Sequence, residues 1–201
     1  MKRIMLMIIL ILVAGGGLFA WMKKTVVMEL PQNAAKAVLP ASPRVLVACF
    51  SHSGNTMIIA RKIQKKTGGA FLEIVPDAPY PQEYKAVVEQ AGKELKEGYR
   101  PPLKSALPDA NSFDVLLVGS PVWWGTIAPP VSSFLAGLDL TGKVVIPFCT
   151  HNGGGPSKVF AGAAALCPKS AFLEGYAAFG KTADYFEGDL DAWLAGIGLV
   201  K

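Results

Sequence analysis

Three short polar segments carry most of the side chains in this chain that could bind or act on a ligand. The first has three hydroxyl groups around a glycine (Ser51–Thr56), and the second has two adjacent tryptophans before a glycine (Pro121–Gly125). The third has a threonine, a histidine and an asparagine before three glycines (Thr150–Gly155). Each segment follows an apolar run, so we expect all three at one edge of a sheet, where a single ligand could contact them.

The first segment is suited to an anion. Ser51, Ser53 and Thr56 offer hydroxyl groups, and Gly54 allows the backbone to turn its N–H groups toward a ligand. Asn55 and Thr56 then begin a predicted helix, whose positive N-terminal end favours a phosphate. An ordinary turn with a helix cap is the alternative, but a cap needs only one hydroxyl group. The segment therefore predicts a phosphate site.

The second and third segments are suited to a planar ring with a polar edge. Trp123 and Trp124 point in different directions if the chain is extended, so at least one should lie at the surface. A large exposed aromatic side chain indicates a binding platform. Thr150, His151 and Asn152 provide polar groups, and the glycines after them allow close approach of the backbone. The third segment alone is a weak signal.

The apolar runs before these segments predict buried parallel strands. Residues 45–50, 115–120 and 143–149 lack the alternation that is typical of a half-exposed strand. Further elements alternate with them: strands over 70–75 and 170–175, and helices over 55–67, 82–97, 130–138, 156–166 and 189–197. This order predicts one α/β domain of five βα units.

Composition excludes several classes of function. Of the 20 basic and 15 acidic residues, five basic and one acidic lie within residues 1–42, so the remainder of the chain is nearly neutral. No arginine-rich stripe is present there, and we expect no nucleic-acid partner. Two histidines and the absence of metal-binding cysteine spacing predict no metal site. The three cysteines are expected to be buried thiols.

The N-terminal region predicts a membrane segment. Residues 4–22 carry no charge, and a bilayer span needs about 20 apolar residues. A cleaved signal peptide is the alternative, although its apolar region is usually only about 7 to 15 residues and Leu18–Ala20 fits the cleavage site poorly. We expect residues 1–24 to be a single-pass anchor or a signal segment, 25–43 a linker and 44–201 the domain. The positive-inside rule slightly favours an extracytoplasmic domain, with a cytoplasmic one left open.

Together, the three segments resemble the flavodoxin-like family. The matching residues are Ser51-x-Ser-Gly-Asn-Thr56, Pro121-x-Trp-Trp-Gly125 and Thr150-His-Asn-Gly-Gly154, and Asp77–Pro81 with Tyr84 resembles a bacterial branch of the family. The resemblance covers about residues 44–200. It implies a three-layer α/β/α sandwich with a five-stranded parallel sheet of order 2-1-3-4-5, here preceded by an N-terminal hydrophobic helix. It also implies flavin mononucleotide (FMN) as the cofactor.

The resemblance assigns roles to individual residues. It implies that side chains of the first segment hold the 5′-phosphate, that Trp124 stacks on the isoalloxazine ring, and that the amides of Trp123, Gly125 and Gly153 approach the ring edges. Residues 150–154 would surround the pyrimidine side. The expected FMN-binding residues are Ser51, His52, Ser53, Gly54, Asn55, Thr56, Pro121, Val122, Trp123, Trp124, Gly125, Thr150, His151, Asn152, Gly153 and Gly154.

The implied activity is electron transfer between redox partners through the flavin. Two features depart from dedicated electron carriers: the domain is nearly neutral rather than strongly acidic, and the third segment lacks the tyrosine that covers the other flavin face in many flavodoxins. An open face would admit a small acceptor. An FMN-dependent NAD(P)H or quinone-type oxidoreductase is therefore the alternative, with His151 as a candidate catalytic proton donor. The partner is then either a redox protein or a small-molecule acceptor.

Overall fold

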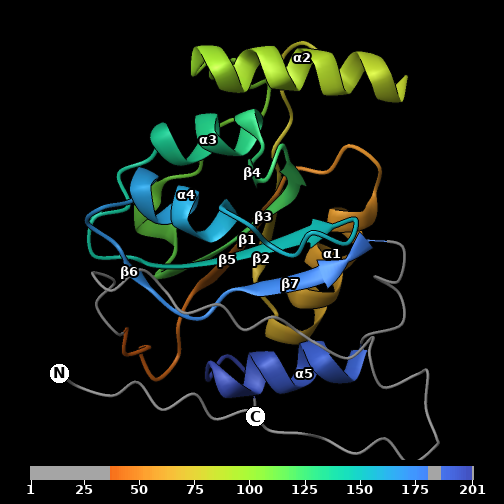
Figure 1. Ribbon diagram of the computed structural model, residues 1–201. Coiled ribbons are helices and arrows are strands. Elements are labelled where there is room, and N and C mark those ends of the chain that lie inside the picture. The colour runs from red at the N-terminus through yellow and green to blue at the C-terminus, as the bar shows by residue number, and fades with distance from the viewer. Residues whose placement is uncertain (1–36, 181–186, 201) are drawn as a thin grey trace, which may run out of the picture.

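Strands and helices alternate along the chain and form three layers, a sheet with helices on both faces (Figure 1). The structure is a computed structural model that describes residues 37–180 and 187–200. The strands are β1 (Val45–Cys49), β2 (Ala70–Glu73), β3 (Val115–Trp123), β4 (Thr126–Ile127), β5 (Val144–His151), β6 (Ala171–Phe172) and β7 (Tyr176–Phe179). The helices are α1 (Asn55–Thr67), α2 (Tyr84–Glu97), α3 (Pro129–Ala136), α4 (Val159–Leu166) and α5 (Glu187–Gly196), with a short 3-10 helix at Ala110–Ser112.

The sheet confirms the predicted parallel α/β architecture and corrects its details. The path through the sheet is β2-β1-β3-β5-β6, with β4 paired to β3 and β7 paired to β5. All of these pairs are parallel except β3 with β4. The predicted number of five strands is wrong, because the described sheet has seven, and the two additional strands change the numbering: the predicted order 2-1-3-4-5 becomes the path β2-β1-β3-β5-β6.

Two local features explain the additional strands. The strand predicted over 170–175 is shortened to β6, and β7 follows it after a break beside Pro147, which has no N–H group to donate to a neighbouring strand. Gly175 lies at the break, where a Cβ atom would be only 2.7 Å from the Pro147 carbonyl oxygen. The other extra strand is β4, which turns back antiparallel onto the end of β3.

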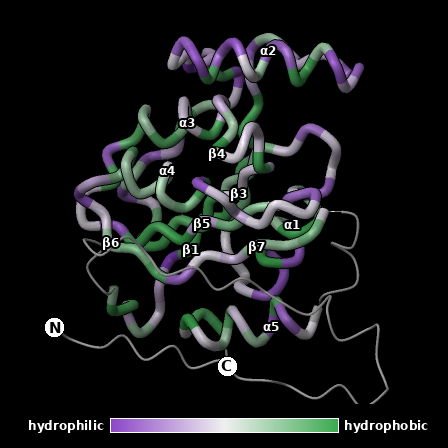
Figure 2. The backbone as a smooth tube through the Cα atoms, viewed as in Figure 1, coloured by the Kyte–Doolittle hydropathy of each residue, from purple (hydrophilic) through white to green (hydrophobic). Residues whose placement is uncertain are grey.

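Each face of the sheet has its own hydrophobic core because successive side chains of a strand point to opposite faces. In β1, Val47 and Cys49 pack with α1 and α5, whereas Leu46 and Ala48 pack with the cluster that includes residues of α2, α3 and α4. Figure 2 shows hydrophobic colours along the central strands and mixed colours along α2, which buries one face only. Cys49, Cys149 and Cys167 are all buried, as predicted.

Strand register brings the three polar segments to one edge of the sheet. Cys49 at the end of β1 lies opposite Gly119 of β3, and Gly119 lies opposite Phe148 of β5. Both β3 and β5 continue beyond this level, so Pro121 and Thr150 also lie side by side. Residues 121–123 and 150–151, predicted as loops, are therefore the last residues of β3 and β5.

The predicted N-terminal anchor or signal segment and its hydrophobic helix lie outside the described residues. Within residues 37–180 and 187–200, no helix is long and apolar enough to cross a bilayer. The predicted linker is described only from Ala37 onward. There, Ala37 and Leu39 pack against the core on the α1 and α5 face.

Candidate functional site

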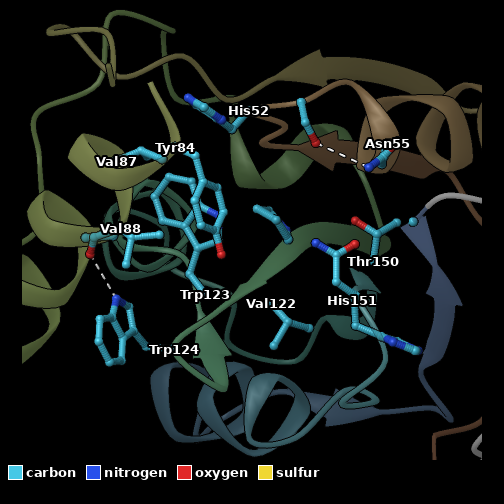
Figure 3. A pocket seen from close by; sticks show the side chains of 15 residues that line it. His52, Asn55, Tyr84, Val87, Val88, Val122, Trp123, Trp124, Thr150 and His151 are labelled. Atoms are coloured by element: carbon cyan, nitrogen blue, oxygen red, sulfur yellow. Dashed lines mark hydrogen bonds between the residues drawn. The ribbon is translucent and has the colours of Figure 1, made fainter. Parts of the chain in front are cut away.

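A pocket opens at the carboxyl ends of β1, β3 and β5 and is bounded on one side by α2 (Figure 3). Its volume is about 470 Å³, within the range of small-molecule sites. Residues of all three polar segments line it, which confirms that the segments lie together. Among the residues that the structure describes, this lining contains no Asp, Glu, Lys or Arg.

The first segment connects β1 to α1 through a turn that leaves hydrogen-bonding groups available. Gly54 has a φ of 87°, a left-handed conformation that favours glycine, and a Cβ atom there would meet nothing within 4 Å. No side chain caps the N-terminus of α1. The Ser51 hydroxyl group is buried without a hydrogen-bond partner in the described part of the chain. Such a group costs about 1 to 3 kcal/mol unless a ligand satisfies it.

Hydrogen bonds fix the other side chains of the first segment. The buried hydroxyl groups of Thr56 and Thr150 lie 2.7 Å apart, which links the first and third segments. Asn55 donates its side-chain amide to the Ser53 hydroxyl group at 3.3 Å. The Nε2 atom of His52 lies 2.8 Å from the Pro81 carbonyl oxygen, which can only accept, so Nε2 carries the proton.

The second segment is a tight hairpin between β3 and β4. Trp124 and Gly125 form its two-residue turn, with φ angles of 49° and 72°. Hairpin turns with positive φ at both positions favour Asn-Gly or Gly-Gly, so tryptophan is costly at the first position. Backbone strain of this kind persists where the surrounding structure holds it, often at functional sites. Trp124 therefore occupies a strained backbone position of the kind that is often found at functional sites.

The two tryptophans take different directions from the hairpin (Figure 3). The Trp123 ring lies in an aromatic cluster, with its centroid 4.9 Å from that of Tyr80, 5.4 Å from Phe50 and 5.9 Å from His52. Trp124 is 66% exposed, and its Nε1–H donates to the Val88 carbonyl oxygen of α2 at 3.0 Å. Both side chains line the pocket, and Trp124 also ties the hairpin to α2.

The third segment places a histidine on the opposite side of the pocket from Tyr84 and Trp123 (Figure 3). His151 accepts a hydrogen bond at Nδ1 from the Gly153 backbone N–H at 3.1 Å, which leaves its proton on Nε2. Partial burial lowers the pKa of His151 below its ordinary value of 6.5. The imidazole is therefore neutral at pH 7 and offers one N–H donor.

Most of the predicted binding residues line the pocket, but the contribution of α2 to the pocket was not predicted. The lining includes ten of them: His52, Ser53, Asn55, Pro121, Val122, Trp123, Trp124, Thr150, His151 and Asn152. The remaining predictions lie in or beside the same segments without lining the pocket: Ser51, Gly54, Thr56, Gly125, Gly153 and Gly154. Five lining residues were not predicted as binding residues: Tyr84, Val87, Val88, Ala91 and Gly180. The apolar residues Val87, Val88 and Ala91 in the predicted helix are the signal that could have indicated that α2 lines the pocket.

Comparison with known proteins identifies relatives across the whole described domain. The family model described as Flavodoxin matches residues 44–196. A proposed flavoprotein from Bacteroides eggerthii DSM 20697 has a similar crystal structure, with 28% identity and a TM-score of 0.69 over 79% of this chain and 99% of that one. A second, from Bacteroides uniformis ATCC 8492, has 25% identity and a TM-score of 0.68 over 76% of this chain and 97% of that one.

A third similar structure supports the fold and contains a ligand. It is a flavoprotein from Lactobacillus acidophilus NCFM in complex with FMN, with 23% identity and a TM-score of 0.60. The match covers 71% of this chain and 97% of that one. No curated protein matches the chain.

Proposed function

The chain belongs to the flavodoxin family, and from this premise we propose that it binds FMN in the pocket beside α2 and transfers electrons through it. The family and the FMN-bound relative both support FMN as the cofactor. When bound, FMN supplies the redox chemistry, and the protein contributes position and electrostatic environment. The residues of the pocket must therefore fit a phosphate at one end and a ring at the other.

The unsatisfied Ser51 hydroxyl group is the observation that carries this proposal. It lies in the segment that leads into α1, where the helix N-terminus lacks a side-chain cap and Gly54 leaves open space. A phosphate would accept hydrogen bonds from these groups and would be favoured by the helix dipole. Ser53 and Asn55 would hold it from the pocket side.

The ring would lie among the aromatic and apolar side chains of β3 and α2. Trp123 supplies one wall, supported by Tyr80 and Phe50, and Val87 with Ala91 supplies the wall from α2. The resemblance to the family implied that Trp124 stacks on the ring. In the structure, its indole lies against α2, with the N–H donating to the Val88 carbonyl oxygen.

A flavin titration of the full-length protein in mild detergent tests the proposal. We expect saturable binding of one FMN per chain, with quenching of flavin fluorescence by the adjacent tryptophan. Stepwise anaerobic reduction then distinguishes the two activities that the family allows. Two well-separated one-electron potentials support a carrier between redox partners, whereas one two-electron potential supports an oxidoreductase. Absence of FMN binding would overturn the proposal.

An FMN-dependent reductase is the second candidate, and the mouth of the pocket favours it. Tyr84 is 78% exposed and Trp124 is 66% exposed, and both line a pocket whose described residues include no charged side chain. These features suit an uncharged, ring-shaped acceptor such as a quinone. His151 would then donate a hydrogen bond or proton from Nε2.

Three substitutions test the second candidate. If the wild type reduces a quinone, Tyr84→Ser should raise the KM for the quinone severalfold without changing FMN affinity. Tyr99→Ser is the matched control, since Tyr99 is exposed beyond the C-terminus of α2 and does not line the pocket. His151→Ala should retain FMN and slow acceptor reduction. Equal effects of the two tyrosine substitutions, or unchanged turnover in His151→Ala, would contradict these assignments.

We also propose that residues 1–24 anchor the protein in a membrane, with the domain on the extracytoplasmic side. The uncharged stretch over 4–22 supports the anchor, and the small excess of positive charge from Lys2, Arg3 and the α-amino group over Lys23 and Lys24 supports the orientation. Resistance of the full-length protein to extraction from membranes by alkaline carbonate would support an uncleaved anchor. Protease digestion of intact cells before and after permeabilisation would then report the side. Release of the protein at high pH would reject the anchor.

A further inference from the structure

A carboxylate is buried on α2, beside the part of the helix that lines the pocket. Glu94 is 8% exposed, although carboxylates are rarely buried without a partner. Its Oε2 atom accepts a hydrogen bond from the Tyr80 hydroxyl group, and its Oε1 atom accepts one from the Gln90 side-chain amide at 2.8 Å. Both of these donors are neutral. Two neutral hydrogen bonds offset only part of the cost of removing a carboxylate from water.

This carboxylate is connected to the pocket through two aromatic rings. Tyr80 is buried, and its ring centroid lies 4.9 Å from that of Trp123, in an edge-to-face arrangement. Trp123 in turn lines the pocket. The hydrogen bond from Tyr80 to Glu94 therefore fixes the ring against which Trp123 rests.

Glu94 also lies on the same face of α2 as the residues that line the pocket. Val87, Ala91 and Glu94 are spaced by four and three residues, which places them on one face of the helix, and all three are buried. Val87 and Ala91 line the pocket, and Glu94 lies one turn further along. Burial and the hydrogen bond to Glu94 raise the pKa of Tyr80 well above its ordinary value. Tyr80 therefore remains a neutral donor.

We propose that Glu94 is a positioning residue that orients Trp123 through Tyr80 and places a fixed negative charge beside the flavin site, so that oxidised FMN is favoured over reduced FMN. The proposal rests on the proposed function. Fully reduced flavin carries negative charge on its ring at neutral pH and above, whereas oxidised flavin does not. Repulsion between this charge and a carboxylate is stronger in a protein interior than in water. Glu94 would thereby lower the reduction potential of the bound flavin.

The test compares the affinities of the two redox states of FMN in full-length protein purified in mild detergent. The ratio of the dissociation constants for reduced and oxidised FMN fixes the potential relative to free FMN. Glu94→Gln keeps the size of the side chain and an acceptor for Tyr80 but removes the charge. We expect this ratio to fall severalfold and the potential to rise. Glu97→Gln is the matched control, since it removes an exposed charge one turn further along α2.

Each outcome of the comparison has a distinct meaning. An unchanged ratio in Glu94→Gln, or an equal change in Glu97→Gln, overturns the electrostatic role. Tyr80→Phe tests the positioning role, because it removes the hydrogen bond that holds the ring beneath Trp123. We expect weaker FMN binding and a shifted visible spectrum of bound flavin in this variant, and an unchanged spectrum and affinity would overturn that role. Failure of the wild type to bind oxidised FMN would instead refute the proposed function.

Discussion

We expect the Ser51 side chain to lower the stability of the FMN-free protein and to strengthen FMN binding. Its hydroxyl group is buried without a partner, so Ser51→Ala should raise the free energy of unfolding of the FMN-free protein by about 1 kcal/mol. The same substitution removes a donor to the phosphate and should weaken FMN binding about tenfold, or about 1.4 kcal/mol. Urea denaturation and flavin titration measure the two effects. A loss of stability in the FMN-free variant would show that the hydroxyl group has another partner.

The lowered pKa of His151 predicts how the free energy of unfolding changes with pH. Its pKa is lowered in the folded state, so the unfolded state binds more protons once the pH falls below about 6.5. The folded state should therefore lose stability as the pH falls through 6.5 toward the lower folded pKa, with no effect above 6.5. Urea denaturation at pH 7.5 and 5.5 should show a smaller loss in His151→Asn than in the wild type. Equal losses would mean that His151 is not desolvated.

The residues of the site were predictable where their chemistry is local. The hydroxyl groups and Gly54 of the first segment follow one strand and begin one helix, so neighbouring residues in the sequence sufficed to suggest a phosphate site. The directions of Trp123 and Trp124 depend on a hairpin and on the distant α2, which no local pattern specifies. The pairing of Glu94 with Tyr80 is likewise tertiary.

At the scale of elements, one glycine allows the central strands to pack. A Cβ atom at Gly119 of β3 would lie 2.3 Å from the Phe148 ring, which is fully buried. Gly119→Ala should therefore lower the free energy of unfolding by about 1 to 3 kcal/mol through overpacking. Gly188→Ala is the control, because that exposed position in α5 has open space and alanine favours a helix by up to about 1 kcal/mol. Thermal denaturation of both variants would measure this contrast, and a neutral effect at Gly119 would contradict it.

Element boundaries were predictable where strong end signals exist. The helix expected over 55–67 matches α1, which begins after Gly54 and ends before Gly68, both with left-handed φ angles. A single strand was predicted over 170–175, whereas β6 and β7 lie on either side of Gly175. The break between β6 and β7 depends on the close approach of Gly175 to Pro147 of another strand. Such contacts between strands cannot be read from a single run of residues.

At the scale of the molecule, the chain enters the domain at the edge of the sheet opposite the pocket. The segment before β1 leads to the amino ends of the parallel strands (Figure 1). The pocket lies at the carboxyl ends of these strands. With the proposed N-terminal anchor, the pocket would face away from the point of attachment.

The same separation predicts independent roles for the segment before β1 and for the pocket. Leu39 packs against the core of the α1 and α5 face, and its Cδ1 atom would lie 3.8 Å from a Cβ atom at Gly198. A chain that begins at Arg44 should therefore be less stable than one that begins at Ala37, by about 1 to 2 kcal/mol for the lost burial of an apolar side chain. FMN affinity should be equal in the two chains, because the removed contacts lie at the far edge of the sheet. Urea denaturation and flavin titration of both chains measure these quantities, and a fall in affinity that accompanies the fall in stability would show that the segment also organises the pocket.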